Sequence, residues 1–171
     1  EIKPDIILNN RLDLPDAADI YTPEQWQPTD WVKVDGEPVV WEACQTFSGS
    51  WGYYRDEMTW KSPGQLIRML VNTVARGGNL LMNVGPTAKG TFDTRAQAAL
   101  AVYGEWMDLH HESIYGATMS EYTEPQDCRM TQKGNKVYIH VFAWPFKFLY
   151  VEGLGDKVAF ARFLHDGSEI P

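Results

Sequence analysis

Two glutamates near aromatic residues are the side chains of this sequence with the clearest chemical potential. Glu42 lies in an apolar run, and Glu57 ends a polar, glycine-rich stretch that contains Trp51 and Tyr53. Hydrolysis of a glycosidic bond needs two carboxyl groups that flank the bond, one of which protonates the leaving oxygen. The neighbouring rings are expected to desolvate a carboxyl group and raise its pKa toward that of a general acid. Solvated or salt-bridged glutamates are the alternative interpretation, because the chain has 23 acidic residues.

The other candidate residues do not have the sequence spacing of a phosphate-binding loop or a metal site. The glycines of segment 83–90 follow a predicted strand, as in phosphate-binding loops, but they fit neither common motif, and Pro86 removes a backbone donor. The four histidines and two cysteines lack the spacing of metal ligands. We therefore expect neither a phosphate loop nor a metal site, and the cysteines are expected to be buried apolar residues.

Apolar runs and helix signals predict alternating strands and helices in the first two thirds of the chain. Buried strands are predicted at 4–11, 38–44 and 79–84, and the proline-rich segment 12–38 is predicted as a long loop. Ser62 is a suitable cap for a helix that ends before Gly77-Gly78. The face of this helix expected to point inward carries Leu66, Ile67, Leu70, Val71 and Val74.

A second helix is predicted from its cap Asp93 to about His110. Its inward residues are expected to include Ala99, Val102, Tyr103, Trp106 and Met107. Strands that alternate with helices favour a parallel sheet with right-handed crossovers. Glu42 is expected at the carboxyl end of its strand and Glu57 in the loop beyond it, which is the edge where barrel enzymes do their chemistry.

The residues after Gly116 have a different period. Strands of an antiparallel sheet are predicted at 136–144, 146–151 and 157–164, with turns at 133–135 and 153–155. The sequence thus predicts two domains, 1–116 and 117–171. The first is too short for a complete (β/α)8 barrel and would leave an unpaired edge, so we expect only the last βα units of such a barrel.

The net charge and composition of the chain exclude several classes of binding partner. The chain has 15 basic and 23 acidic residues, a formal charge of −8, which has the wrong sign for nucleic acid or an anionic membrane. No apolar run approaches the roughly 20 residues of a membrane span, and the first residues do not resemble a signal peptide. Aromatic residues make up 13% of the chain, which fits a sugar-stacking surface or a large core equally well.

Five blocks, in order and spacing, resemble the family 29 α-L-fucosidases. They are Trp41-Glu42-Ala43-Cys44, Ser50-Trp51-Gly52-Tyr53, the ten residues from Gly77 to Pro86, Gly104-Glu105-Trp106 and Ile114-Tyr115-Gly116. The resemblance implies a retaining exo-hydrolase of fucosylated glycans without metal or organic cofactor. It also implies a (β/α)8-like TIM barrel followed by a β-sandwich, here incomplete. Relatives are commonly exported, periplasmic or lysosomal, but the compartment of this chain is unknown.

The resemblance assigns roles residue by residue. Glu57 aligns with the acid/base of some bacterial members, and Glu42 is the second candidate because that position varies in the family. Gln45 stands where some relatives have an arginine in the fucose pocket, so it is expected to bind a hydroxyl without bringing charge. Trp51 and Tyr53 are expected either to pack on the sugar or to shape the loop.

The resemblance also implies an absence, because the nucleophilic aspartate of the family lies upstream of the first matching block. The chain is therefore predicted to be part of a longer enzyme, or to be completed by another chain. Two alternatives remain: a carbohydrate-binding or assembly module without catalysis, and a homo-oligomer in which open barrel edges pair.

Overall fold

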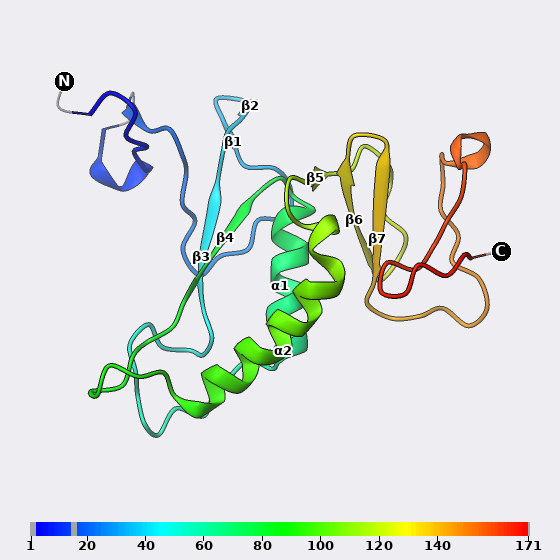
Figure 1. Ribbon diagram of the computed structural model, residues 1–171. Coiled ribbons are helices and arrows are strands. Elements are labelled where there is room, and N and C mark those ends of the chain that lie inside the picture. The colour runs from blue at the N-terminus through cyan, green and yellow to red at the C-terminus, as the bar shows by residue number, and fades with distance from the viewer. Residues whose placement is uncertain (1–2, 15–16, 171) are drawn as a thin grey trace.

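A parallel strand pair with two helices forms the first part of the molecule, and an antiparallel sheet follows it (Figure 1). The computed structural model describes residues 3–14 and 17–170. β3 (Glu42–Thr46) and β4 (Asn79–Asn83) pair in parallel, with their first residues opposite each other. The helices α1 (Pro63–Val74) and α2 (Thr94–His110) lie side by side next to these strands. The predicted parallel pairing is confirmed.

Helix α1 begins and ends where its local signals predict. The Ser62 hydroxyl accepts a hydrogen bond from the Gln65 amide, and the Gln65 side chain accepts one from the Ser62 amide, which completes a capping box. Leu66, Leu70, Val71 and Val74 are buried as expected. After the helix, Gly77 adopts a φ of +75°, and a Cβ there would lie 2.4 Å from the Trp31 ring, so only glycine fits.

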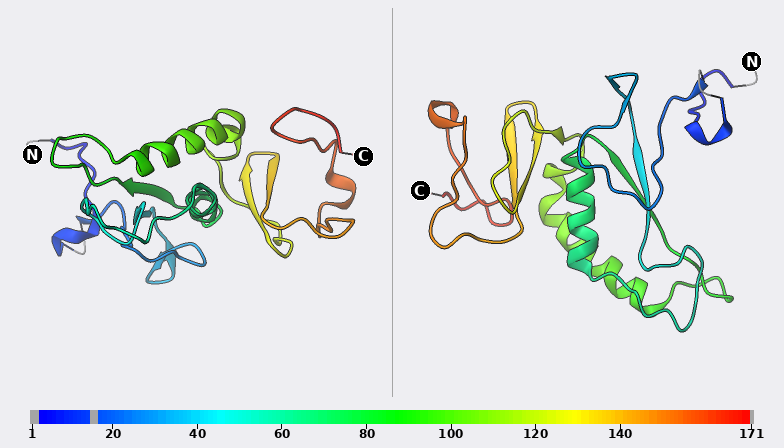
Figure 2. Two further views of the ribbon diagram at one scale, coloured as in Figure 1. Left: turned by 90° about the horizontal axis from the view of Figure 1, so that it is seen from below. Right: turned by 180° about the vertical axis from the view of Figure 1, so that it is seen from behind.

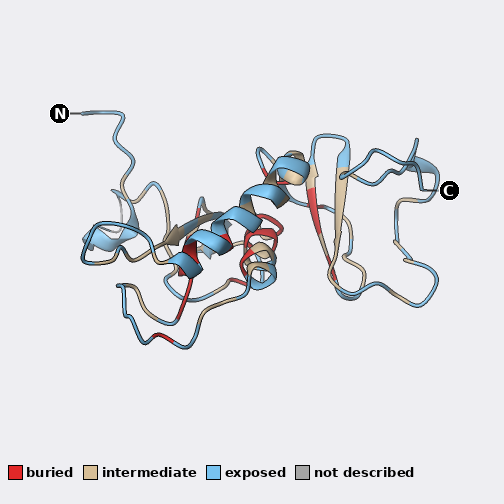
Figure 3. Ribbon diagram, turned by 60° about the horizontal axis from the view of Figure 1, so that its bottom comes forward, coloured by how far each residue is buried: buried red, intermediate tan, exposed pale blue. Residues whose placement is uncertain are grey.

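Helix α2 also begins at its predicted cap, because the Asp93 carboxylate accepts a hydrogen bond from the Arg95 amide. Ala99 is buried, and Tyr103, Trp106 and Met107 pack against the core, as predicted. Val102 is 42% exposed, so its predicted inward position is wrong. Much of the α2 surface faces outward (Figure 3). Within the described ranges, no helix is both long enough and apolar enough to cross a membrane.

The segment before β3 differs from the prediction in three ways. Residues 4–11 do not form a buried strand: Ile6 and Ile7 are 57% and 69% exposed, and Asn9 makes a single parallel bridge to Ile20. Part of the predicted loop runs parallel to β3 instead, through bridges that pair Tyr21 with Trp41 and Glu24 with Cys44. The same loop contains the short hairpin β1 (Lys33–Val34) and β2 (Glu37–Pro38).

An antiparallel sheet in the order β5-β6-β7 follows α2. It consists of β5 (Thr118–Met119), β6 (Cys128–Lys133) and β7 (Lys136–Val141), and the predicted turn at 133–135 joins β6 to β7. The predicted strands 146–151 and 157–164 are wrong. Phe146 and Phe148 alternate in the sequence like strand residues, but they are 95% and 84% exposed, with no neighbouring strand to pair with in the described part of the chain.

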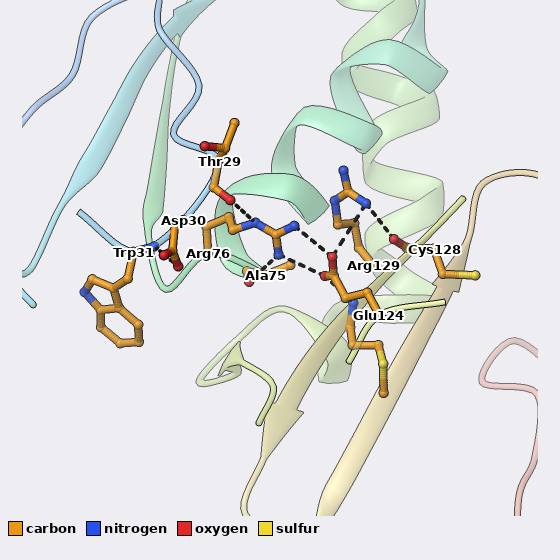
Figure 4. Close-up of polar contacts among 9 residues, drawn as sticks. Thr29, Asp30, Trp31, Ala75, Arg76, Glu124, Cys128 and Arg129 are labelled. Atoms are coloured by element: carbon orange, nitrogen blue, oxygen red, sulfur yellow. Dashed lines mark hydrogen bonds and ion pairs between the residues drawn. The ribbon is translucent and has the colours of Figure 1, made fainter. Parts of the chain in front are cut away.

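A half-buried ion pair connects the end of α1 to the antiparallel sheet (Figure 4). Arg76, just beyond α1, donates two hydrogen bonds to the Glu124 carboxylate, at 2.9 and 2.7 Å, and one to the Thr29 carbonyl. The Glu124 carboxylate also accepts a hydrogen bond from the Met130 amide of β6. The sheet and the two helices are neighbours in both further views (Figure 2), so this network lies at the contact between the two parts.

Candidate functional site

The loops that follow β3 and β4 meet around Glu57. A small cavity of about 20 Å³ lies between them. Its walls are Phe47, Ser48, Ser50, Gly52, Tyr53, Tyr54, Glu57, Trp60, Asn83, Val84 and Gly85. The space suits about one water molecule and is too small for a pyranose ring. The position at the carboxyl edge of parallel strands is the one expected for an active site.

Glu57 is a buried carboxylate with three hydrogen-bond donors. The Ser50 hydroxyl donates to Oε2 at 2.6 Å, while the Thr59 hydroxyl and amide donate to Oε1 at 2.6 and 2.8 Å. These bonds, led by that from Ser50, lower the pKa of Glu57 to about 2. The expectation that neighbouring rings raise this pKa is therefore wrong, because hydrogen bonding to the charged form outweighs its desolvation.

Lys61 closes the loop that carries Glu57. Its ammonium donates to the carbonyl oxygens of Thr46 and Ser48 at 2.7 and 3.1 Å, and its amide donates to the Phe47 carbonyl. The next residue is the cap of α1. The loop thus leaves the end of β3 and returns to it at the start of a well-capped helix, which fixes both of its ends.

A close approach of backbones holds the second loop against the first. The Asn83 side-chain amide donates to the Trp51 carbonyl at 2.6 Å. A Cβ at Gly85 would lie 2.5 Å from the Tyr53 nitrogen and 2.6 Å from the Gly52 carbonyl carbon, so glycine is required here. The Gly85-Pro86 pair that ends the sequence block 77–86 therefore lies at a contact between the two loops.

Gly85→Ala is expected to destabilise the chain by about 1 to 3 kcal/mol, because the new methyl group collides with rigid backbone. Urea unfolding of the chain measures this change. Gly104→Ala is the matched control: a Cβ there meets nothing within 4 Å in α2, so alanine should stabilise by up to about 1 kcal/mol. Equal effects of the two substitutions would contradict the close approach.

The structure brings together some of the predicted site residues. Tyr53 lines the cavity beside Glu57, and Trp51 takes part through its carbonyl group. Gln45 is buried within β3, where its amide donates at 3.4 Å to the Trp26 carbonyl. Glu42 is the first residue of β3, so its predicted place at the carboxyl end of the strand is wrong. It lies one strand length from the edge that holds Glu57.

Sequence reasoning missed the residues that hold Glu57 in place. Ser50 and Thr59 lie seven residues before and two after it, but hydroxyl residues in a polar loop give no specific signal. Lys61 and Arg95 are equally ordinary by type, and Arg95 is 38 residues away from Glu57 in the sequence. In residues 3–14 and 17–170, no three His, Cys, Asp or Glu side chains are grouped as metal ligands.

Comparison with known proteins gives a consistent match to one family. The model of the family Alpha-L-fucosidase matches residues 1–112. The chain is 41% identical over 80 residues to an α-L-fucosidase of Dictyostelium discoideum, and 38% identical over 109 residues to the tissue α-L-fucosidase of Bos taurus. These matches cover 46% and 61% of this chain, but only 17% and 23% of the relatives.

Solved structures of the same family match almost the whole chain. α-L-Fucosidase isoenzyme 1 from Paenibacillus thiaminolyticus is 36% identical, with a TM-score of 0.93, over 99% of this chain and 42% of that protein. A family 29 α-L-fucosidase of Bacteroides thetaiotaomicron, trapped as a covalent intermediate in a glutamate-to-glutamine variant, has a TM-score of 0.84 at 26% identity. That match covers 98% of this chain and 43% of that protein. The chain spans less than half of each of these relatives, and it belongs to the family 29 α-L-fucosidases.

Proposed function

We propose that this chain is the later part of a retaining, exo-acting α-L-fucosidase that releases fucose from fucosylated glycans. One observation carries the proposal: a buried glutamate lies at the carboxyl edge of two parallel strands, in a chain of this family. In this proposal residues 1–116 are the last βα units of a (β/α)8-like barrel, and residues 117–171 belong to a β-sandwich. Strands outside this chain would bring the other walls of the sugar pocket.

Glu57 is the proposed acid and base. In the first step a carboxylate from outside this chain attacks the anomeric carbon, and Glu57 gives its proton to the leaving glycosidic oxygen. In the second step Glu57 takes a proton from water, which attacks the anomeric carbon and frees fucose with retention. The two carboxyl groups are expected about 5 to 5.5 Å apart.

The protonation state of Glu57 is consistent with only one half of this cycle. A carboxylate with a pKa of about 2 is ionised, as the second step requires, although weakly basic, whereas the first step needs its protonated form. A second carboxylate within a few ångströms would raise the pKa of Glu57, because like charges disfavour ionisation. We therefore propose that the upstream nucleophile both attacks the sugar and keeps Glu57 protonated.

A chimera tests the proposed function. In it this chain replaces the matching 42% of the Paenibacillus enzyme, and hydrolysis of 4-nitrophenyl α-L-fucoside is followed at pH 5 to 7. We expect turnover with retained configuration by proton NMR, and none with the β-D-galactoside. A folded chimera that binds fucose without turnover would instead favour the binding-module alternative, with which the low pKa of Glu57 is compatible because binding needs no protonated acid.

A further inference from the structure

Arg95 reaches from helix α2 to the backbone of the loop that carries Glu57. Its Nη1 donates to the Glu57 carbonyl oxygen at 3.0 Å, and its Nη2 donates to the Arg55 carbonyl at 3.2 Å. Arg95 is the second residue of α2, so the contact joins the loop to a helix 38 residues further along the chain. These bonds fix the backbone at the residue whose side chain is the proposed acid and base.

The guanidinium is itself held from two other directions. The Asp93 carboxylate accepts hydrogen bonds from Nε at 2.8 Å and Nη2 at 3.0 Å. Only 13% of the Asp93 side chain is exposed, and Asp93 also caps α2. On its other side the guanidinium lies over the Trp60 ring, with 4.7 Å from Cζ to the ring centre, and Trp60 is a wall of the cavity. Because the guanidinium is planar and rigid, these partners together hold it in a single orientation.

Arg95 also places a fixed charge near the Glu57 carboxylate. The hydrogen bond to Asp93 is the main cause that raises the pKa of Arg95, and the charge of Glu57 adds to it. Burial lowers the pKa of Lys61, and the charge of Glu57 opposes that lowering. The carboxylate itself is bonded to Ser50 and Thr59. Asp93 neutralises part of the guanidinium charge. Arg95 therefore acts on the loop mainly through its two hydrogen bonds to the backbone and less through its charge.

We propose that Arg95, held by Asp93 and Trp60, is a positioning residue that fixes the loop backbone at Glu57 and so sets where the Glu57 carboxyl group stands. This inference rests on the proposed function where it concerns catalysis. The role of Arg95 in holding the loop does not depend on the proposed function. A lysine in its place keeps the charge but loses the fork, and a methionine loses both while keeping an unbranched side chain.

The loop part is tested on the chain itself with Arg95→Met, Arg95→Lys and, as a matched control on the neighbouring helix, Arg68→Met. Amide hydrogen exchange of residues 50–61 is measured by mass spectrometry, and the titration of Glu57 by NMR. We expect about tenfold faster exchange in both Arg95 variants, together with a higher pKa of Glu57, because a displaced carboxylate bonds less well to Ser50 and Thr59. Unchanged exchange and titration in Arg95→Met, relative to Arg68→Met, would overturn the proposal.

The catalytic part is tested in the chimera with two substrates. Displacement of a strongly acidic phenol needs little protonation, whereas release of a sugar alcohol depends on the acid. Arg95→Met is expected to lower kcat/KM for a fucosyl disaccharide by about 10- to 100-fold, as for a small misplacement of a catalytic group, with a much smaller loss for the aryl fucoside. An equal loss on both substrates would refute a role through Glu57. Changed exchange in an inactive chimera would leave Arg95 as the holder of the loop and count against the proposed function alone.

Discussion

Glu57→Gln is expected to lower kcat/KM of the chimera for a fucosyl disaccharide by about 10²- to 10⁴-fold, the usual contribution of a general acid. Glutamine keeps the shape of the side chain and can still bond to Ser50 and Thr59, but it has no proton to give to the leaving oxygen. The loss should be far smaller for an aryl fucoside with an acidic phenol, because that leaving group departs as an anion. Steady-state kinetics with both substrates measure the difference.

Two further results distinguish acid and base catalysis by Glu57 from a purely structural role of its side chain. Azide, which needs no base, is expected to restore release of the sugar from the covalent intermediate and to give α-fucosyl azide. Glu42→Gln is the matched control, since Glu42 starts β3 and Glu57 lies beyond its other end. If the disaccharide activity fell with Glu42→Gln and stayed with Glu57→Gln, the assignment of the acid would be reversed.

Elements with local signals were predicted well. The start of α1 is encoded in the four consecutive residues 62–65, because Ser62 and Gln65 form the capping box and Pro63 suits the first helical position. Asp93 caps α2 for the same reason. Such signals act over a few residues and depend little on the rest of the chain.

Strands without a fixed neighbour were predicted poorly, because a strand exists only with a partner. The alternating aromatic residues of 146–151 have the sequence of a half-buried strand, yet Phe146 and Phe148 stay exposed. Residues 20–24 have no strand signal and include Pro23, which cannot donate a backbone hydrogen bond. They nevertheless run beside β3 through bridges to residues about 20 positions further along the chain. Pattern alone does not say which segments meet.

The candidate site shows the same division. Glu57 and its place after a strand could be predicted from the sequence and from family resemblance. Its three hydrogen bonds could not, because hydroxyl residues carry no sign of whether they face a carboxylate or water. The predicted sign of its pKa shift was therefore wrong. Arg95 was missed since its contact to Glu57 exists only after α2 folds back on the loop.

Arg76→Met is expected to lower the free energy of unfolding of the chain by about 1 to 3 kcal/mol, between the costs of breaking an exposed and a fully buried pair, because it leaves a half-buried carboxylate without its main partner. The Arg76 and Glu124 side chains are only 17% and 19% exposed, and Figure 4 shows the fork of Arg76 on both carboxylate oxygens. Arg129, whose Nη1 lies 3.6 Å from Glu124 Oε2, is too distant to replace it. Urea unfolding at pH 7 measures the change.

A double substitution and an exposed pair provide the controls. Arg76→Met with Glu124→Leu removes both charges and is expected to recover most of the lost stability. Arg11→Met removes an arginine that pairs with Glu24 at the surface, where both side chains are more than 40% exposed, and should cost less than about 1 kcal/mol. Equal costs for Arg76→Met and Arg11→Met would mean that the Arg76–Glu124 pair stabilises the fold no more than an exposed pair does.

The same pair gives a pH dependence with a defined sign. Burial alone would raise the pKa of Glu124, but the hydrogen bonds from Arg76 and the Met130 amide, with the nearby positive charges, lower it overall. A lowered pKa in the folded state stabilises the fold above the ordinary pKa of glutamate, near 4.5, and this stabilisation is lost as the pH falls through the lowered value. The difference in unfolding free energy between the native chain and Arg76→Met should therefore be constant from pH 6 to 8 and shrink below pH 4.5. A difference that persisted undiminished at pH 2 would show that Arg76 acts through the Thr29 carbonyl and packing, not through the charge of Glu124.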